Sequence, residues 1–205
     1  MEQVYDLSLW GGNEKEFYSG EGSHNPEMVT PYINAIQAFL SSFKNKLTVC
    51  DLGCGDFNIG NQLVNYAKTY IAIDIVASLI ERNKSIFKHS NLTFKTLDIT
   101  KAVLPTADCV IVRQVLQHLS NAEVQCIVKK LANYKYVLLT EHLPTGEFTP
   151  NKDIISGQGI RIKKQSGIHL LKPPFNFKPI YCKELVRISL PNNKGEIRTT
   201  QYTVF

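Results

Sequence analysis

Asp51-Leu52-Gly53-Cys54-Gly55-Asp56 directly follows the apolar run at 47–50, and this stretch decides the fold class. A short apolar run that ends in an acidic residue and two glycines predicts a β-strand breaking into a tight loop that leads to a helix. Glycines in such a loop let a ligand approach the backbone closely. No Gly-Lys-Ser/Thr follows, which excludes a nucleoside-triphosphate loop, and the dinucleotide fingerprint needs a glycine where Asn58 stands.

Three more carboxylates, those of Asp56, Asp74 and Asp98, lie in or after expected strand ends. Because like charges repel, this many acids would disfavour a pyrophosphate and favour a ligand that carries positive charge. The sequence therefore predicts a cationic ligand at this loop and argues against a dehydrogenase.

Strands and helices alternate on both sides of the loop. Thr30-Pro31 is expected to begin an N-terminal helix, and Ser120 with Glu123 forms a capping box for another. The pattern predicts strands at 47–51, 70–74, 92–97, 108–112 and 136–140, and helices around 59–67, 76–87 and 120–132. Repeated strand–helix units of this size predict a parallel sheet with right-handed crossovers.

The last part of the chain has a different character. Residues 144–179 hold five prolines and four glycines without helical periodicity. Two strands, at 181–190 and 196–205, then flank the turn sequence at 192–195 and predict a closing hairpin. An irregular segment this long is usually functional or disordered, and we expect 144–179 to cover a ligand pocket, with a poorly ordered surface loop as the alternative.

The acidic glycine loop resembles the first motif of class I S-adenosylmethionine-dependent methyltransferases, an acidic residue followed by Gly-x-Gly-x-Gly. Asp51, Gly53 and Gly55 match it, and Phe57 replaces the third glycine. Similarity to one bacterial subfamily, Phe57 included, covers nearly the whole chain. Its motifs are Ser-Gly-x-Gly-Ser at 19–23, Cys-Gly-Asp-Phe-Asn at 54–58, Asp-Ile-Val at 74–76, Arg-x-x-Leu-x-His-Leu at 113–119 and Pro-Asn-x-Asp-Ile at 150–154.

This resemblance implies an α/β fold: a Rossmann-like three-layer sandwich with a mostly parallel seven-stranded sheet and a C-terminal antiparallel β-hairpin. We expect a single methyltransferase domain over 1–205. It would comprise an N-terminal lid and helix at 1–46, a cofactor-binding core at 47–143, and an irregular acceptor-side segment with the closing hairpin at 144–205. The family places a helix between its fifth and sixth strands, where this chain has the irregular segment.

The implied cofactor is S-adenosyl-L-methionine, whose sulfonium and ammonium groups suit an acidic loop. Asp74 is placed to accept both ribose hydroxyls, although it could also cap a helix, and Asp98 with Ile99 matches the adenine-edge position or a simple turn. A lid at 19–23 would cover the cofactor carboxylate, with a flexible tail as the alternative. The predicted cofactor-binding residues are Ser19, Gly20, Gly22, Ser23, Asp51, Gly53, Cys54, Gly55, Asp56, Asn58, Asp74, Ile75, Asp98, Ile99, Arg113 and Gln114.

The predicted catalytic residues lie at the ends of the fourth and fifth strands. In the resembled family the stretch from Arg113 to His118 faces the methionine end of the cofactor and the acceptor. His118 could accept a proton near neutral pH or be structural, and Glu141 and His142 are further candidates. No spacing of histidines and carboxylates resembles a metal site, so no metal is expected.

The function expected first is methyl transfer to a sugar hydroxyl or another small metabolite, because the resembled subfamily is associated with cell-surface sugar biosynthesis. The alternative is an RNA or protein methyltransferase that docks through residues 161–205, where nine Lys or Arg face only two acids. The same lysines could instead protect a sheet edge. A non-catalytic cofactor-binding module is a third hypothesis, suggested by Phe57 and the missing helix.

Composition predicts a cytoplasmic protein. The stretch 1–6 shows no signal peptide, and no apolar run is long enough to insert into a membrane. Five cysteines, three of them in apolar runs and none in a Cys-x-x-Cys pair, favour buried thiols in a reducing compartment.

Overall fold

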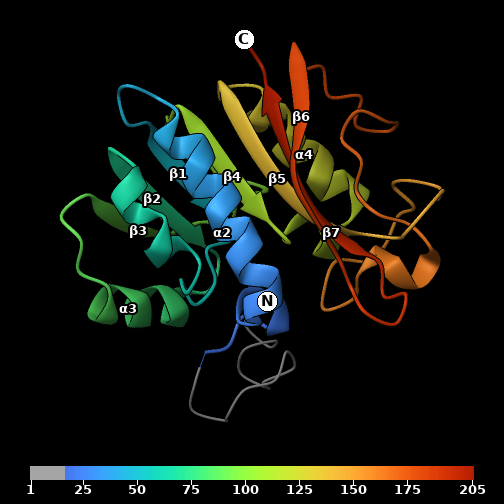
Figure 1. Ribbon diagram of the computed structural model, residues 1–205, viewed down its shortest axis with the longest axis horizontal. Helices are drawn as coiled ribbons and strands as arrows, with labels where there is room; N and C mark the ends of the chain where they lie inside the picture. The colour runs from blue at the N-terminus through green and yellow to red at the C-terminus, as the bar shows by residue number, and fades with distance from the viewer. Residues whose placement is uncertain (1–16) are drawn as a thin grey trace. The chain divides into compact units, whose positions relative to one another are not determined.

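The computed structural model describes residues 17–205 (Figure 1). The chain divides into two compact units, Met1–Ala107 and Asp108–Phe205. The stretch 1–6, for which the sequence predicted no signal peptide, lies outside the described residues. Within residues 17–205 no helix has both the length and the apolar character that crossing a membrane requires. All five cysteines are free thiols; Cys50 and Cys109 are buried, whereas Cys126 and Cys182 are exposed.

The first unit is built on three parallel strands. Leu52 lies beside Ile73, and Asp74 lies beside Thr96. The carboxyl ends of neighbouring strands therefore meet at one edge of the sheet. Its elements are η1 (Glu21–Ser23), α2 (Pro26–Ser41), β1 (Thr48–Leu52), η2 (Gly60–Gln62), η3 (Val64–Tyr66), β2 (Thr69–Asp74), α3 (Ala77–Ile86) and β3 (Leu92–Thr96).

Helix α2 begins earlier than the sequence predicted. The side chain of Asn25 accepts a hydrogen bond from the backbone of Glu27, and Pro26 occupies the first helical position, so the helix starts there and Pro31 lies inside it. The prediction that Thr30-Pro31 begins the helix was wrong. Burial of six side chains along one face of α2 offsets the hydrogen bond that Pro31 cannot donate.

The helix predicted around 59–67 is also corrected. Two short 3₁₀ turns, η2 and η3, occupy this stretch. Gly60, Asn61, Val64 and Asn65 all have low helix propensity, and the side chain of Asn91 donates to the carbonyls of Val64 and Ala67 at 3.0 Å each. The chain therefore makes i→i+3 turns here because its carbonyls find a partner outside the segment.

The second unit contains a parallel pair and an antiparallel hairpin. Strand β5 pairs parallel with β4 and antiparallel with β7, and β7 pairs with β6. The capping box of Ser120 and Glu123 is confirmed at the start of α4. The elements are β4 (Cys109–Arg113), η4 (Leu116–His118), α4 (Asn121–Leu131), β5 (Tyr136–Leu143), η5 (Arg161–Lys164), β6 (Tyr181–Ser189) and β7 (Glu196–Thr203).

The strand order is β3-β2-β1-β4-β5-β7-β6, a seven-stranded and mostly parallel sheet that ends in an antiparallel hairpin. This confirms the predicted Rossmann-like α/β fold class. Strands β1, β4 and β5 are buried almost throughout, as parallel strands covered on both faces must be. Strand β6 is the exposed edge strand and carries Lys183 and Arg187, in agreement with the edge-protecting role considered for these basic residues.

The segment at 144–180, all of which is described, has η5 as its one helical element and holds no strand. The irregular character predicted for this part of the chain is therefore confirmed. It packs onto its own unit through buried apolar side chains, among them Ile168, Leu170 and Phe175. The poorly ordered loop considered as an alternative does not fit this packing.

Candidate functional site

The glycine loop turns immediately after β1. The amides of Gly53 and Cys54 both donate to the carbonyl of Ile73, at 2.8 and 2.9 Å, so the end of β2 holds the loop in place. Gly53 and Gly55 have φ values of 80° and 56°, in the left-handed region that side chains disfavour. The backbone conformation alone therefore favours glycine at both motif positions.

Asp74 fastens this loop from the end of β2. Its Oδ2 accepts from the amide of Gly55 and its Oδ1 from the amide of Val76, each at 3.1 Å. Burial raises the pKa of Asp74, while the amides of Val76 and Gly55 act in the opposite direction. Val76 is the N-cap of α3, so Asp74 contacts the residue before the helix and does not cap its first turn.

Negative charge is concentrated around the loop. Burial, Asp74 and Asp51 all raise the pKa of the Cys54 thiol well above its ordinary value. Asp51 itself is buried in β1 and accepts a hydrogen bond from the Tyr70 hydroxyl at 2.9 Å. Burial, the largest of these causes, disfavours charge of either sign, whereas the carboxylates of Asp74 and Asp51 disfavour only negative charge and so favour a cationic ligand over an anionic one.

The two glycine-containing motifs meet at Asp56. Ser19 donates its amide to Asp56 Oδ2 and its hydroxyl accepts from the Asp56 amide, both at 2.8 Å. His24 Nε2 lies 2.6 Å from the same carboxylate oxygen, and Asn58 donates its side-chain amide to the carbonyl of Ser23 at 2.6 Å. The carboxylate of Asp56 therefore binds the N-terminal segment.

Phe57 fills the position of the motif's third glycine and keeps a glycine-like backbone, with φ 65°. Its ring is fully buried among Tyr70, Phe87 and Phe94, at centroid distances of 5.8, 5.1 and 4.8 Å. A Cβ on Gly60 would lie 2.2 Å from the Phe57 ring. Burial of the Phe57 ring compensates for the strained backbone of this residue. The position of the ring leaves space only for a glycine at residue 60.

Two residues of α3 that the sequence reasoning did not single out support the loop from outside. Asn83, which is fully buried, donates to the carbonyl of Gly55 at 2.7 Å, and Arg82 donates to the carbonyl of Asp56 at 3.0 Å. Asn83 shares the buried face of α3 with Leu79 and Ile80. In the sequence, the polar Asn83 among the apolar residues of that helix face was the feature that could have indicated a buried hydrogen bond.

The predicted adenine-side residues occupy a turn after β3. Oδ1 of Asp98 accepts from the amide and the hydroxyl of Thr100, at 2.9 and 2.6 Å, and these bonds lower the pKa of Asp98. Ile99 is buried, whereas Ile75 is 44% exposed directly after β2. Asp98 thus makes the turn considered as its alternative role, and Ile75 presents an apolar surface beside Asp74.

In the second unit, β4 ends at Arg113 and the chain reverses at Gln114. The Gln114 amide donates to the carbonyl of Thr140 at 2.7 Å, and its backbone takes φ 55°. His118 follows in η4; burial lowers its pKa, so its imidazole is neutral at pH 7. The amide of Gly157 donates to the carbonyl of His118 at 3.0 Å, which ties η4 to the irregular segment.

Arg161 makes most of the hydrogen bonds between η4 and the irregular segment, and the sequence did not indicate this role. The side chain is 1% exposed and donates to five acceptors in two stretches of chain. These are the carbonyls of Leu116, Gln117, Leu119 and Lys152 and the Oδ1 of Asn121, at 2.7–3.3 Å. Arg161 is therefore a structural anchor of the η4 region.

Glu141 and His142 lie near the end of β5 in different environments. Glu141 is buried, and burial raises its pKa to about 8 against the opposing effects of Arg161 and the amides of Leu116 and Gln117. His142 Nε2 lies 2.6 Å from the carbonyl of Lys194. Because a carbonyl only accepts, Nε2 carries the proton and Nδ1 is the acceptor.

The predicted site residues thus fall into two groups. The first unit brings the glycine loop, Asp74 and the stretch 19–23 together, with Asp98 in a turn of the same unit. The second unit holds Arg113, Gln114, His118, Glu141 and His142.

Comparison with known proteins supports a common origin for this arrangement. The model of a family described as "Methyltransferase domain" matches residues 43–151, more than half of the chain. A phosphoethanolamine N-methyltransferase from Triticum aestivum is 30% identical over 104 residues, which are 48% of this chain and 20% of that protein. The chain therefore spans about a fifth of the length of this curated relative.

Two solved structures share the fold along the whole chain. The N-methyltransferase NodS from Bradyrhizobium japonicum, in complex with S-adenosyl-L-homocysteine, superposes with a TM-score of 0.68 at 12% identity, covering 98% of this chain and 97% of that one. Magnesium protoporphyrin IX methyltransferase from Synechocystis, with bound S-adenosylhomocysteine, gives 0.62 at 15% identity over 98% and 96%. Together with the family match, the glycine loop and the sheet order, these likenesses show that the chain belongs to the methyltransferase domain family.

Proposed function

We propose that the chain is an S-adenosylmethionine-dependent methyltransferase acting on a small-molecule acceptor, either a sugar hydroxyl or another small metabolite. The observation that carries the proposal is the contact of the buried Asp74 with the amide of Gly55 inside an acidic glycine loop. The two units would form one methyltransferase domain, a proposal supported by the NodS chain, which matches both.

The loop residues fit this cofactor in charge and in shape. The carboxylates of Asp74 and Asp51, which act together with the larger effect of burial to raise the pKa of Cys54, suit a ligand with a sulfonium and an ammonium group. The backbone of Gly53 and Gly55 leaves room for close approach. Asp51 and Asp56 contribute charge, although their carboxylates are already hydrogen-bonded to Tyr70 and to Ser19.

Asp74 is proposed to hold the cofactor ribose. Each carboxylate oxygen accepts one backbone amide, and a carboxylate offers about four acceptor sites. The Ile75 amide also acts on this carboxylate, and the acceptor sites that these three amides do not use are available for the ribose hydroxyls. Ile75, exposed beside Asp74, would contact the adenine, with Asp98 and Ile99 at its edge.

The segment 19–23 is proposed to cover the cofactor carboxylate. Gly20 has φ 83°, and the Ser23 amide donates to the Gly20 carbonyl at 3.0 Å, so this segment is a compact turn. Its attachment to Asp56 places it at the glycine loop. Arg113 and Gln114 complete the proposed cofactor-binding set from the end of β4.

The cofactor supplies a methyl group that is already activated for transfer, so the protein has to align the acceptor and exclude water. A hydroxyl acceptor must also lose its proton. His118, neutral at pH 7, is the best placed chemically to take that proton, and Nδ1 of His142 is a second acceptor. Glu141 keeps its proton below about pH 8, which makes it a weaker base at neutral pH.

A small acceptor is favoured over RNA or protein because several basic side chains of residues 161–205 form hydrogen bonds or ion pairs within the protein. Arg161 is buried among carbonyls. Arg187 and Arg198 pair with Glu184 and Glu196. The names of the similar proteins, a phosphoethanolamine and a magnesium protoporphyrin methyltransferase, also specify small molecules.

Calorimetry tests the proposal. S-adenosylhomocysteine and S-adenosylmethionine should bind the purified chain with one site, and NAD should not bind. Incubation with methyl-labelled S-adenosylmethionine and pools of sugars or amino compounds should then transfer label to one class. Equal binding of NAD, or no binding of either adenosyl compound, would contradict the assignment.

A further inference from the structure

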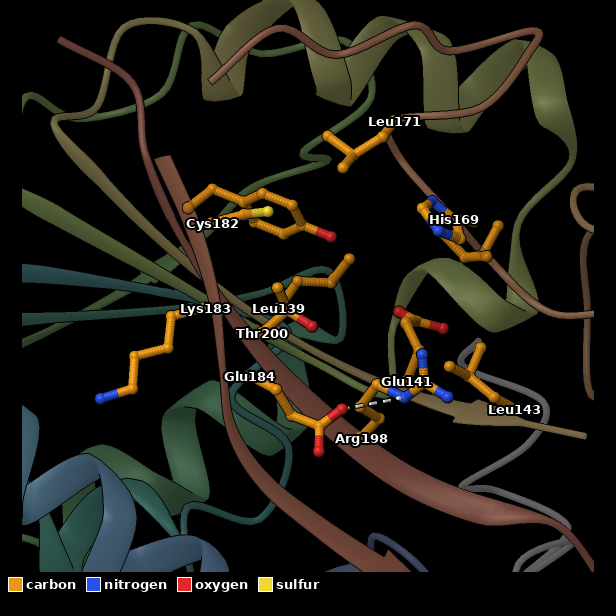
Figure 2. Close-up of a pocket in the computed structure, with 12 residues that line it drawn as sticks. Leu139, Glu141, Leu143, His169, Leu171, Cys182, Lys183, Glu184, Arg198 and Thr200 are labelled. Atoms are coloured by element: carbon orange, nitrogen blue, oxygen red, sulfur yellow. Dashed lines mark ion pairs between the residues drawn. The ribbon is translucent and has the colours of Figure 1, made fainter. Parts of the chain in front are cut away.

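A pocket of about 190 Å³ lies in the second unit, between the strands β5, β6 and β7 and the irregular segment (Figure 2). Leu139 and Leu143 of β5 and Ile168 and Leu171 of the irregular segment give it an apolar wall. Pockets for drug-sized ligands measure about 300–1,000 Å³. This one therefore suits a ligand of few atoms.

Glu141 is the outstanding polar group of the pocket. Its side chain is 2% exposed, and neither carboxylate oxygen makes a hydrogen bond of good geometry among the described residues, although the amides of Leu116 and Gln117 lie close enough to lower its pKa. The nearby cation, Arg161, donates its N–H groups to four backbone carbonyls and to the side chain of Asn121. A buried carboxyl group without a partner is rare and costly in folded proteins, so it points to a ligand that completes the site.

His169 supplies a second unpaired polar atom. Its Nδ1 is buried without a hydrogen-bond partner, and burial together with Lys172 and Arg198 lowers its pKa, so the ring is neutral at pH 7. Figure 2 shows His169 and Glu141 on the same side of the pocket, with Cys182 and Lys183 on the other. A neutral imidazole and a carboxyl group together can accept two N–H donors.

The other charged groups of the pocket are already balanced or exposed. Arg198 pairs with Glu196, and its Nε lies 3.6 Å from Glu184. Glu184 also pairs with Arg187 at 2.6 Å. Lys183 is exposed on the edge strand β6. The charge that a ligand would complement is therefore the one on Glu141.

We propose that this pocket binds a small organic ammonium ion, which donates N–H groups to Glu141 and His169 and packs a short hydrocarbon part on Leu139, Leu143, Ile168 and Leu171. A bound cation offsets the cost of ionising a buried carboxyl group. Binding should therefore lower the pKa of Glu141 from about 8. Every contact lies within 108–205 and requires no cofactor, so failure of this proposal and failure of the proposed function are separate results.

The test uses isobutylamine as the cationic probe and isobutanol as a neutral probe of the same shape, titrated calorimetrically into the wild-type chain at pH 8. The amine should bind saturably, and isobutanol at least tenfold more weakly. Glu141→Gln should weaken amine binding at least tenfold. Glu184→Gln, the matched change at the pocket's exposed carboxylate, should stay within twofold of wild type.

A second measurement works on the wild-type chain alone. Carbon-13 labelling of glutamate carboxyl groups reports the pKa of Glu141 by NMR, and saturating isobutylamine should lower it by at least one unit. The proposal is overturned if the amine does not bind saturably, if isobutanol binds equally well, if Glu141→Gln binds the amine as wild type does, or if the pKa of Glu141 is unchanged.

Discussion

Ser19 and Asp56 are joined by two reciprocal hydrogen bonds of 2.8 Å, in which each residue donates its backbone amide to the side chain of the other. They are 37 residues apart and belong to two of the motifs that this chain shares with the resembled subfamily, Ser-Gly-x-Gly-Ser and Cys-Gly-Asp-Phe-Asn. The pair fixes the N-terminal segment to the glycine loop. Cofactor binding and order of the N-terminal segment should therefore depend on each other.

Ser19→Ala tests this dependence. Loss of the hydroxyl acceptor leaves the Asp56 amide unpaired, which should cost about 0.5–1.5 kcal/mol of cofactor binding. Calorimetry should show S-adenosylhomocysteine binding about twofold to tenfold more weakly, and limited proteolysis should cut before residue 26 more readily. Ser42→Ala removes a hydroxyl bonded to the Phe39 carbonyl at the end of α2 and serves as the control. Equal effects from both substitutions would refute a specific role for Ser19.

Gly60→Ala should destabilise the fold because the new methyl group would overlap the Phe57 ring, whose nearest atom lies 2.2 Å from the Cβ position. Overpacking of this kind costs about 1–3 kcal/mol. Urea denaturation measures the loss, with Gly159→Ala as the control because a Cβ there meets nothing within 4 Å. In a Phe57→Leu background the cost of Gly60→Ala should shrink, and additive effects would show that the ring is not the cause.

Arg161→Met should destabilise the η4 region strongly. It leaves the carbonyls of Leu116, Leu119 and Lys152 without their donor, and the loss at the buried carbonyl of Leu116 alone costs about 1–3 kcal/mol. Hydrogen exchange should accelerate at 116–121 and at 152–166. Lys163→Met, on the exposed side of the same turn, should leave exchange unchanged. A similar pattern in both variants would mean that Arg161 is not the anchor.

The raised pKa of Glu141 predicts a pH-dependent stability. The folded carboxyl group holds its proton up to about pH 8, whereas the unfolded one releases it near its ordinary 4.5. Between these values the folded state binds more protons, so this contribution to the free energy of unfolding is complete below 4.5 and falls as the pH rises, by at most about 1.4 kcal/mol per pH unit.

Urea denaturation at pH 5 and pH 8 checks this dependence. Glu141→Gln should lack this pH dependence. The free energy of unfolding of the variant, relative to that of wild type, should therefore be higher at pH 8 than at pH 5. His169, whose pKa is lowered, acts with the opposite sign but equally in both proteins. A parallel pH dependence in wild type and Glu141→Gln would rule out a buried protonated Glu141.

The sequence predicted the strands, the closing hairpin and the glycine loop because these depend on local patterns: apolar runs, turn residues and the residues at strand ends. It misplaced the start of α2 because Asn25-Pro26 and Thr30-Pro31 are both good helix starts, and the helix begins at the first of them, where Asn25 caps it and Val29 is buried. It missed Asn83 and the anchoring role of Arg161 because their partners, the carbonyls of Gly55 and Leu119, lie 28 and 42 residues away. Every residue has a backbone carbonyl, so the sequence does not indicate which carbonyl a distant side chain will bond.

Phe57 is another residue whose role could not be deduced from the sequence alone. The sequence identified it as a departure from the glycine motif, and its meaning depends on three aromatic neighbours and on Gly60. The structure shows a residue that keeps the backbone of the missing glycine. The suggestion that Phe57 marks a loss of catalysis therefore has no support in the loop geometry.

The central claim is that Asp74 holds the ribose of S-adenosylmethionine at the glycine loop, and calorimetry of S-adenosylhomocysteine binding to Asp74→Asn tests it most directly. The variant should stay folded by circular dichroism and bind more weakly by about 1.5–3 kcal/mol, the range for hydrogen bonds to a charged group, which is roughly tenfold to 150-fold. Glu81→Gln, on the exposed side of α3, should bind as wild type does. Unchanged affinity in a folded Asp74→Asn protein would contradict the account.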